Sequence, residues 1–79
     1  MELSQLRALV EVRQRGRNGS AKAIRIAAGL TIAEVAAAVG VGESTVSRWE
    51  GGSRQPRGEA ALRWAALLTE LSTAQRDAA

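Results

Sequence analysis

One short segment of the chain, residues 43–50, combines side chains that could recognise another molecule by hydrogen bonding. Its only apolar residues, Val46 and Trp49, are three positions apart, which places them on one face of a helix. The other face then presents a carboxylate, three hydroxyl groups and a guanidinium, from Glu43, Ser44, Thr45, Ser47 and Arg48. Such groups pair with the edges of bases in the DNA major groove. Because the formal net charge is also positive, at +3, we expect double-stranded DNA to be the partner.

The composition does not favour other kinds of site. The chain contains no Cys and no His, which removes disulfides and the usual zinc fingers. It also lacks a Gly-rich phosphate loop and a pair of carboxylates expected on one face. We therefore expect neither an enzyme nor a metal or cofactor site.

The sequence also predicts where the protein works. No stretch has the length and apolar character of a membrane span, and the N-terminus lacks a signal-peptide pattern. We expect a cytoplasmic protein without a membrane partner.

Length and composition predict one all-helical domain that must position the polar segment. A chain of 79 residues makes at most one domain, and abundant Ala without Phe or Tyr favours helices over strands. A first helix is expected over Leu3–Gln14. One face of it carries Leu3, Leu6, Leu9 and Val10, with Arg13 at its end. Two glycines and an Asn in residues 15–19 should end this helix.

The next two helices have recognisable ends. Ser20 is expected to cap a second helix that ends near Ala28, before a left-handed Gly29. Its inward residues are expected to be Ile24, Ala27 and Ala28. A third helix should begin at Thr31, which can form a reciprocal capping box with Glu34, and should end at a left-handed Gly40.

The fourth helix is expected over residues 43–50, and the last helix is expected over residues 58–71. Its inward residues are expected to be Ala61, Leu62, Ala65, Ala66, Leu68 and Leu71. Residues 72–79 lack an apolar face and are expected to form a flexible tail. The predicted organisation is a compact bundle of about five helices. It has an N-terminal helical extension with a basic Gly-containing linker (1–19), a DNA-binding domain (20–71) and the tail.

Residues 21–71 resemble the lambda-repressor-like, Cro/Xre-type helix-turn-helix family of DNA-binding proteins. The resemblance covers about two-thirds of the chain and includes residue spacing, glycine positions and a closing Trp-Glu-x-Gly. The residues that carry it are Arg25, Gly29, Leu30, Thr31, Glu34, Val35, Ala36, Gly40, Val41, Ser44, Thr45, Val46, Ser47, Arg48, Trp49, Glu50, Gly52, Pro56 and Leu62. It implies an all-α, lambda-repressor-like bundle whose second motif helix enters the major groove.

The resemblance also assigns roles within the motif. Ala36 is expected where the two helices cross, and Gly40 is expected to make the tight turn between them. The positions that read bases in the family are Glu43, Ser44 and Arg48, with Thr45 and Ser47 nearby. Arg48 can donate two hydrogen bonds to guanine or can clamp a phosphate. Glu43 can accept from a cytosine amino group or can complement the helix dipole, and both alternatives stay open.

Phosphate contacts are expected from three places. The third helix offers the free amides of Ile32 and Ala33 at its N-terminus, and the second helix offers Lys22. The loop after the recognition helix offers Ser53, Arg54, Gln55 and Arg57. Many family members have Gln at the position of Ile32, which cannot hydrogen-bond through its side chain. Either its backbone amide alone makes the contact, or its side chain packs on the preceding helix or on a thymine methyl.

The family pattern further implies a structural ion pair. An Arg in the first helix of the motif pairs with the Glu that ends the recognition helix, and these residues are Arg25 and Glu50 here. Removing one partner of a buried pair leaves an uncompensated charge. We therefore interpret both as structural residues and not as DNA readers.

The two tryptophans receive different interpretations. Trp49 is expected in the core because its spacing from Val46 is helical. Trp64 lies off the predicted apolar face of its helix, so we expect it at a subunit interface, where Trp is enriched. A place at the edge of the core is the alternative.

The first nineteen residues precede the part that resembles the family, and three interpretations stay open. They could form a helix that completes the core, a dimerisation helix that also offers a surface for another protein, or a basic arm in which Arg13, Arg15 and Arg17 reach the DNA backbone or the minor groove. A flexible linker with incidental charge is the further alternative.

Together these features predict a sequence-specific transcriptional regulator, a Cro/Xre-like repressor of phage, prophage or other bacterial origin. It would act on the bacterial nucleoid and would bind operator DNA as a homodimer on two half-sites. One alternative is an antitoxin-type protein-interaction module with autoregulatory DNA binding. Another is a DNA-architectural or excision-control factor.

Overall fold

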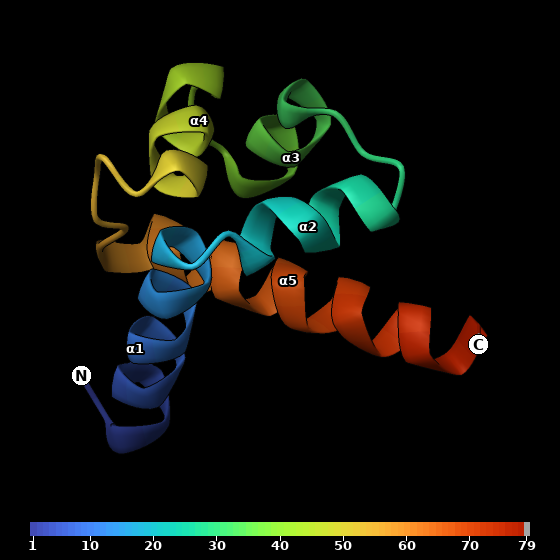
Figure 1. Cartoon of the computed structure of the whole chain (residues 1–79). Helices are drawn as coiled ribbons and strands as arrows, with labels where there is room; N and C mark the ends of the chain where they lie inside the picture. Colours follow the sequence, from blue (N-terminus) through green and yellow to red (C-terminus); the bar gives the residue numbers. More distant parts are fainter. Residues whose placement is uncertain (79) are drawn as a thin grey trace.

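The computed structural model describes residues 1–78, which form five helices and no strand (Figure 1). The helices are α1 (Leu3–Arg17), α2 (Ser20–Ala27), α3 (Ile32–Val39), α4 (Glu43–Gly51) and α5 (Gly58–Ala78). The predicted all-α class with about five helices is confirmed. No helix in this part of the chain combines the length and apolar character needed to cross a membrane.

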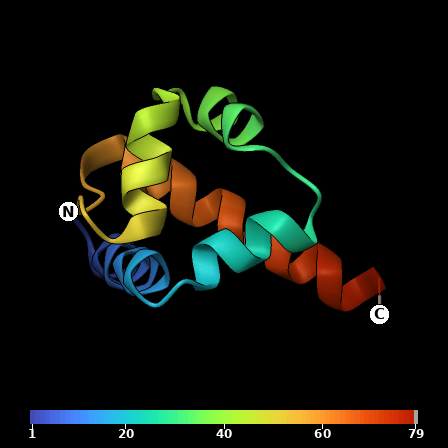
Figure 2. The same ribbon diagram turned by 45° about the horizontal axis from the view of Figure 1, so that its top comes forward.

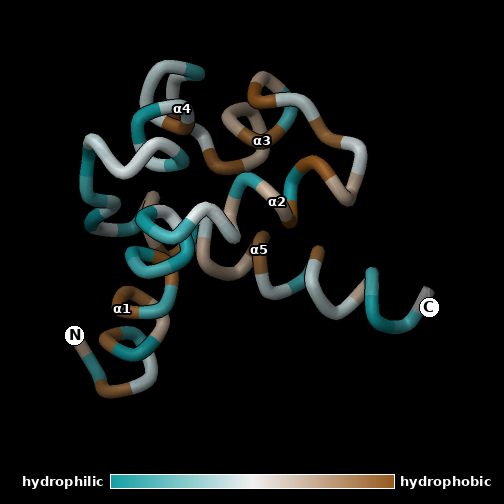
Figure 3. Tube along the Cα trace, in the orientation of Figure 1, coloured by the Kyte–Doolittle hydropathy of each residue, from teal (hydrophilic) through white to brown (hydrophobic). Residues whose placement is uncertain are grey.

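The long helix α5 holds the bundle together, because α1, α2 and α3 all pack against it. α3 and α4 lie next to each other on one side of α5, and α1 packs at the end of α5 where α4 also lies (Figures 1 and 2). The start of α1 and the end of α5 lie at opposite ends of the molecule (Figure 2). Hydrophobic residues dominate α3, whereas α4 and the loop after it are largely hydrophilic (Figure 3).

The centre of the core is a pair of tryptophans. The ring centroids of Trp49 in α4 and Trp64 in α5 are 4.8 Å apart, with the rings tilted by 34°. Trp64 is 0% exposed, so the expectation that it lies at a subunit interface was wrong. The buried face of α5 is turned relative to the predicted one, because Trp64 lies on it together with Ala61, Ala65 and Leu68, whereas Leu62 is only half-buried.

Helix α1 turns a different face to the core from the one predicted. Its buried residues are Leu9, Val12 and Gly16. Three residues of the predicted apolar face are exposed instead, namely Leu3, Leu6 and Val10. The helix also continues to Arg17 instead of ending at Gln14, so its end is a helical turn and not a linker.

Gly16 explains this orientation of α1. A Cβ atom at Gly16 would lie 2.6 Å from the carbonyl oxygen of Trp49, so α1 approaches α4 as closely as only glycine allows. The approach brings the face with Val12 and Gly16 against the core. The structure agrees with the interpretation in which this helix completes the core, while pairing through its exposed residues and contact of its arginines with DNA stay predictions.

The start of α2 differs from the prediction. The capping position is Gly19, with φ of +84°, and the side-chain oxygen of Asn18 accepts a hydrogen bond from the amide of Ser20 at 2.9 Å. Ser20 is already the first helical residue, so the prediction that it caps the helix was wrong. Ala27 is exposed, whereas Ala21 is fully buried. The buried face of α2 is therefore offset from the predicted one.

The ends of α3 confirm the predicted capping. The amide of Glu34 donates to the Thr31 hydroxyl at 3.0 Å, and the amide of Thr31 donates to the Glu34 carboxylate at 2.9 Å. The Thr31 hydroxyl also donates to this carboxylate at 3.1 Å. The hydrogen bonds from the Thr31 amide and hydroxyl to the carboxylate lower the pKa of Glu34 below its ordinary value. At the other end, Gly40 adopts the predicted left-handed conformation, with φ of +83°.

Helix α5 is longer than predicted. Residues 72–78 continue it, so the expected flexible tail is helical over these residues, and Ala79 lies outside the described residues. The amide group of Gln75 donates to the carbonyl oxygen of Ile24 at 3.1 Å, a contact with α2 that fixes this part of α5. Ala66, which was predicted to face the core, is exposed.

Candidate nucleic-acid interface

A tight turn sets the arrangement of α3 and α4. The amides of Gly40 and Val41 both donate to the carbonyl oxygen of Ala36, at 2.8 Å and 3.1 Å. Ala36 is only 3% exposed, and its small side chain allows the two helices to come close together. Val41 packs against the core from within the turn. These contacts give the helix-turn-helix arrangement that the sequence predicted.

Two buried residues hold α4 with its polar face outward. Val46 and Trp49 are 0% and 4% exposed. The side chains predicted to read bases all lie on this helix, and all are exposed except Thr45, which is half-buried: Glu43, Ser44, Thr45, Ser47 and Arg48. The helix therefore presents a row of hydrogen-bonding groups to the solvent on the face opposite its anchors.

The start of α3 offers free backbone donors beside α4. The first hydrogen bond along the helix runs from the amide of Val35 to the carbonyl oxygen of Thr31 at 3.1 Å. The amides of Ile32 and Ala33 precede it, and such amides at a helix N-terminus attract anions. The Ile32 side chain is half-buried and packs against the core, whereas the contact of its backbone amide with DNA stays a prediction. The exposed Lys22 of α2 lines a shallow pocket together with Ile32, Ser47, Gly51 and the two residues of an ion pair, Arg25 and Glu50.

Arg25 and Glu50 form this ion pair through two parallel hydrogen bonds. The Nε–Oε2 and Nη2–Oε1 distances are 2.7 Å and 3.0 Å. Nη1 of Arg25 also donates to the carbonyl oxygen of Leu30 at 2.9 Å. The hydrogen bonds to Glu50 raise the pKa of Arg25 above its ordinary value. One guanidinium therefore joins α2, the segment before α3 and the end of α4, which fixes the orientation of the recognition helix.

The loop between α4 and α5 is also held in place. The amides of Ser53 and Arg54 donate to the carbonyl oxygen of Arg48, at 3.0 Å and 3.3 Å. Pro56 is buried, whereas the four residues predicted to contact phosphate are exposed: Ser53, Arg54, Gln55 and Arg57. The loop thus places two guanidinium groups beside the C-terminal end of α4.

Two arginines support this region through contacts that the sequence did not predict, and one of them, Arg13, was expected in a basic arm instead. Nε of Arg13 donates to the carbonyl oxygen of Pro56 at 2.8 Å, which ties α1 to the loop. Nε of Arg63 donates to the carbonyl oxygen of Val39 at 2.8 Å, which ties α5 to the end of α3. Both acceptors are backbone atoms far away in the sequence, and no side-chain pattern indicates such a partner.

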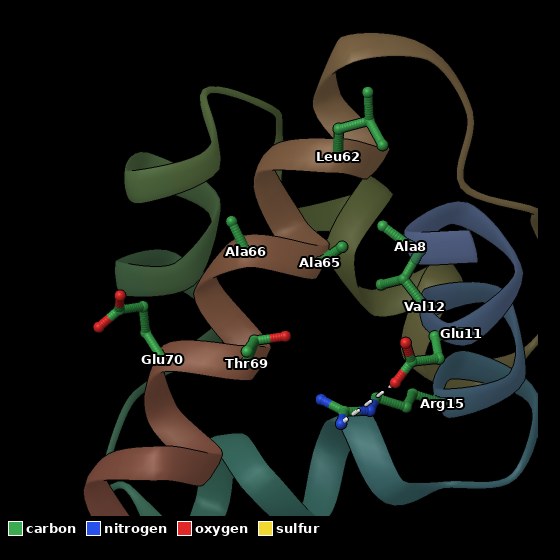
Figure 4. A pocket seen from close by; sticks show the side chains of 9 residues that line it. All are labelled: Ala8, Glu11, Val12, Arg15, Leu62, Ala65, Ala66, Thr69 and Glu70. Carbon is green, nitrogen blue, oxygen red and sulfur yellow. Dashed lines mark ion pairs between the residues drawn. The ribbon is translucent and has the colours of Figure 1, made fainter. Parts of the chain in front are cut away.

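A larger hollow lies elsewhere, in the groove between α1 and α5 (Figure 4). Its lining is mostly apolar and consists of Ala8, Val12, Leu62, Ala65 and Ala66, with Glu11, Arg15, Thr69 and Glu70 as its polar members. Arg15 is the only residue of the basic-arm interpretation that lines this groove, and no residue predicted to contact DNA from α2, α3, α4 or the loop after α4 does so. The polar interface and the groove are therefore separate surfaces.

Comparison with known protein families places the polar interface in context. Residues 22–73 match the model of a helix-turn-helix family, of the Cro/C1-type and Xre-like kind. No curated protein and no solved structure matches the chain significantly. Because the matched residues make up more than half of the chain, the chain belongs to this family, and it is a DNA-binding protein. Helix α1 lies outside the matched residues.

Proposed function

We propose that this member of the helix-turn-helix family is a sequence-specific transcriptional repressor that occupies operator DNA with α4 in the major groove. The observation that carries the proposal is the fixed, outward polar face of α4. Val46 and Trp49 anchor that helix, and the buried pair of Arg25 with Glu50 holds its end. A recognition helix fixed in this way presents its side chains to DNA without a large loss of conformational freedom on binding.

Direct readout follows from the chemistry of this face. Arg48 is exposed and can donate two hydrogen bonds to the O6 and N7 atoms of one guanine. Glu43 in the first turn can accept from a cytosine amino group. The hydroxyl groups of Ser44, Thr45 and Ser47 serve shorter contacts to bases or phosphates.

Phosphate contacts flank this face on both sides. On one side are Lys22 and the amides of Ile32 and Ala33, and on the other is the loop with Arg54 and Arg57. Ser53 and Gln55 add polar groups to the loop. Contacts of this kind fix the position of a protein on DNA and supply most of the salt-dependent affinity.

We further propose that two copies bind one operator, on half-sites about one helical turn apart. A single module makes few phosphate contacts and binds weakly, so pairing on DNA would supply much of the affinity. The exposed apolar residues Leu3, Leu6 and Val10 of α1, which are 83%, 44% and 54% exposed, offer the surface for pairing. A regulator of this kind, of bacterial, prophage or phage origin, would work in the cytoplasm on the bacterial nucleoid.

The proposal is tested by binding to operator-like and random duplexes over a series of salt concentrations. Arg48→Ala should relax the preference for one base pair, at a loss of about 1–3 kcal/mol on the preferred sequence. Arg54→Ala should weaken binding to all sequences alike and reduce the salt dependence by about one phosphate contact. An equal loss on every sequence for Arg48→Ala would reject its base-reading role.

A second candidate function is favoured by the same exposed apolar residues of α1. In that case Leu3, Leu6 and Val10 would bind a different protein, as in an antitoxin, and DNA binding would be autoregulatory. Sedimentation of wild type and Leu6→Lys, with and without DNA, distinguishes the repressor dimer from the antitoxin-like module. A self-association that Leu6→Lys abolishes favours the repressor dimer. A monomer at all concentrations that pairs only with a protein encoded beside it favours the second candidate.

A further inference from the structure

Four arginines from two distant parts of the chain meet at one end of the molecule. Arg13 and Arg17 belong to the last turns of α1, and Arg54 and Arg57 belong to the loop after α4. They line two adjoining shallow pockets, one with Arg13, Arg17 and Arg54 and the other with Arg13 and Arg57. No carboxylate lines either pocket, and none of the four is in an ion pair among the described residues. The cluster is therefore a concentrated positive surface.

Contacts between backbones fix the end of α1 beside the recognition helix. Gly16 packs directly on the carbonyl group of Trp49. A Cβ atom at Gly52, which ends α4, would lie only 3.6 Å from the Cα atom of Arg17. The backbone of Arg17 is thus held at the C-terminal end of α4, next to the loop that carries Arg54.

Arg13 and Arg17 differ in what their side chains do. Arg13 is half-buried and donates through Nε to the carbonyl oxygen of Pro56 at 2.8 Å. With the amide of Gln55 in its favourable orientation, the Gln55 oxygen also accepts from Arg13, at 2.9 Å and 3.0 Å. Arg17 is exposed and lies in the same pocket as Arg54. One guanidinium is therefore occupied with the loop, and the other faces the solvent.

We propose that the end of α1 is part of the DNA interface, in which Arg17 binds a backbone phosphate next to the one bound by Arg54. Arg13 acts as a positioning residue that holds the loop with Arg54 and Arg57. This inference rests on the proposed DNA binding of α4 and extends its footprint to a helix outside the family match at residues 22–73. The occupant is the DNA backbone, because guanidinium groups bind phosphate through paired, charge-assisted hydrogen bonds.

A structural role for Arg17 makes different predictions. A cation at the C-terminal end of α4 could complement the helix dipole. In that case the Arg17→Gln variant would melt at a lower temperature and would bind DNA with the wild-type salt dependence. Phosphate binding predicts the reverse, with an unchanged melting temperature and a changed salt dependence.

The test measures binding of the full chain to a fluorescently labelled random-sequence duplex over a series of salt concentrations. Such a duplex reports phosphate contacts independently of the operator sequence. The association constant K falls as the salt concentration rises, and Arg17→Gln should make the plot of log K against log salt less steep by about 0.9. The same variant should weaken binding about tenfold near 50 mM salt. Arg76→Gln is the matched control, because it removes the same charge from an exposed site near the end of α5, far from the loop and from the exposed apolar residues of α1. It should keep the wild-type slope.

A double-mutant cycle tests the positioning role of Arg13. If Arg13 acts by holding the loop, Arg13→Gln and Arg54→Gln should weaken DNA binding less together than the sum of their separate effects. The effects of Arg76→Gln and Arg54→Gln should be additive. Additivity for Arg13 as well would overturn its role.

The outcomes separate this inference from the proposed function. If wild type binds DNA and Arg54→Gln reduces the salt dependence, but Arg17→Gln behaves like Arg76→Gln, the inference is overturned while the proposed function stands. If wild type does not bind duplex DNA, both are overturned. A less steep salt dependence for Arg17→Gln, at an unchanged melting temperature, supports the inference.

Discussion

Breaking the ion pair between Arg25 and Glu50 should destabilise the domain strongly. The two side chains are only 11% and 5% exposed, and two parallel hydrogen bonds join them. Glu50→Leu leaves the guanidinium with only the Leu30 carbonyl oxygen as a partner. Breaking a buried pair in this way costs about 3–5 kcal/mol. A chain of 79 residues has a total free energy of unfolding of about 4–12 kcal/mol, so this single change removes much of it.

The assay is urea unfolding, followed by the fluorescence of the paired Trp49 and Trp64. Arg25→Met, Glu50→Leu and the double variant complete a cycle. The double variant should lose much less free energy of unfolding than the two single variants lose in sum. The difference, which is the coupling free energy of the pair, should be about 2–3 kcal/mol.

A second ion pair of the same chain provides the control. Arg15 and Glu11 of α1 are 3.9 Å apart, and their side chains are 27% and 60% exposed. An exposed helical pair of this kind should show a coupling of about 0.3–0.5 kcal/mol. If the coupling between Arg25 and Glu50 is no larger than in this control, the pair does not hold α4, and our explanation of the fixed recognition helix is wrong.

Two further changes test the packing of α1 and the start of α3. Gly16→Ala places a Cβ atom 2.6 Å from the carbonyl oxygen of Trp49 and should lower the free energy of unfolding in urea by about 1–3 kcal/mol. The control Gly51→Ala has open space around it and should not destabilise the protein. Similar stabilities of the two variants would refute the close approach of α1 to α4. Hydrogen bonds from Thr31 lower the pKa of Glu34, so their stabilisation is complete above the unfolded-state pKa, near 4.5, and is lost as the pH falls through the lowered value. In an NMR titration Thr31→Ala should raise the pKa of Glu34, and an unchanged pKa would contradict the capping box.

The recognition motif could be predicted from the sequence because short-range patterns determine it. The capping box of Thr31 and Glu34, the left-handed Gly40 and the spacing of Val46 and Trp49 each specify local structure within a few residues. The resemblance to the helix-turn-helix family across these residues also predicted Glu50 as the partner of Arg25.

The position of α1 could not be predicted, because it depends on contacts between distant residues. Leu6 and Val10 look like core residues in an apolar periodicity but are exposed, since the close approach of Gly16 to Trp49 turns another face inward. Glycine has no side chain that contributes to a hydrophobic pattern, so the sequence pattern does not indicate that Gly16 is buried. The end of α5 was missed for a similar reason, because the bond from Gln75 to Ile24 joins polar groups that periodicity ignores.

An NMR titration of the full chain with duplex DNA tests the central claim most directly, because it shows which backbone amides respond to binding. The proposal predicts shifts concentrated in α4 over residues 43–48, at Ile32 and Ala33, and in the loop over residues 53–57. Amides that line the groove between α1 and α5, such as those of Ala66 and Thr69, should stay unchanged. Shifts centred on that groove, with α4 unaffected, would contradict the assignment of α4 as the recognition helix.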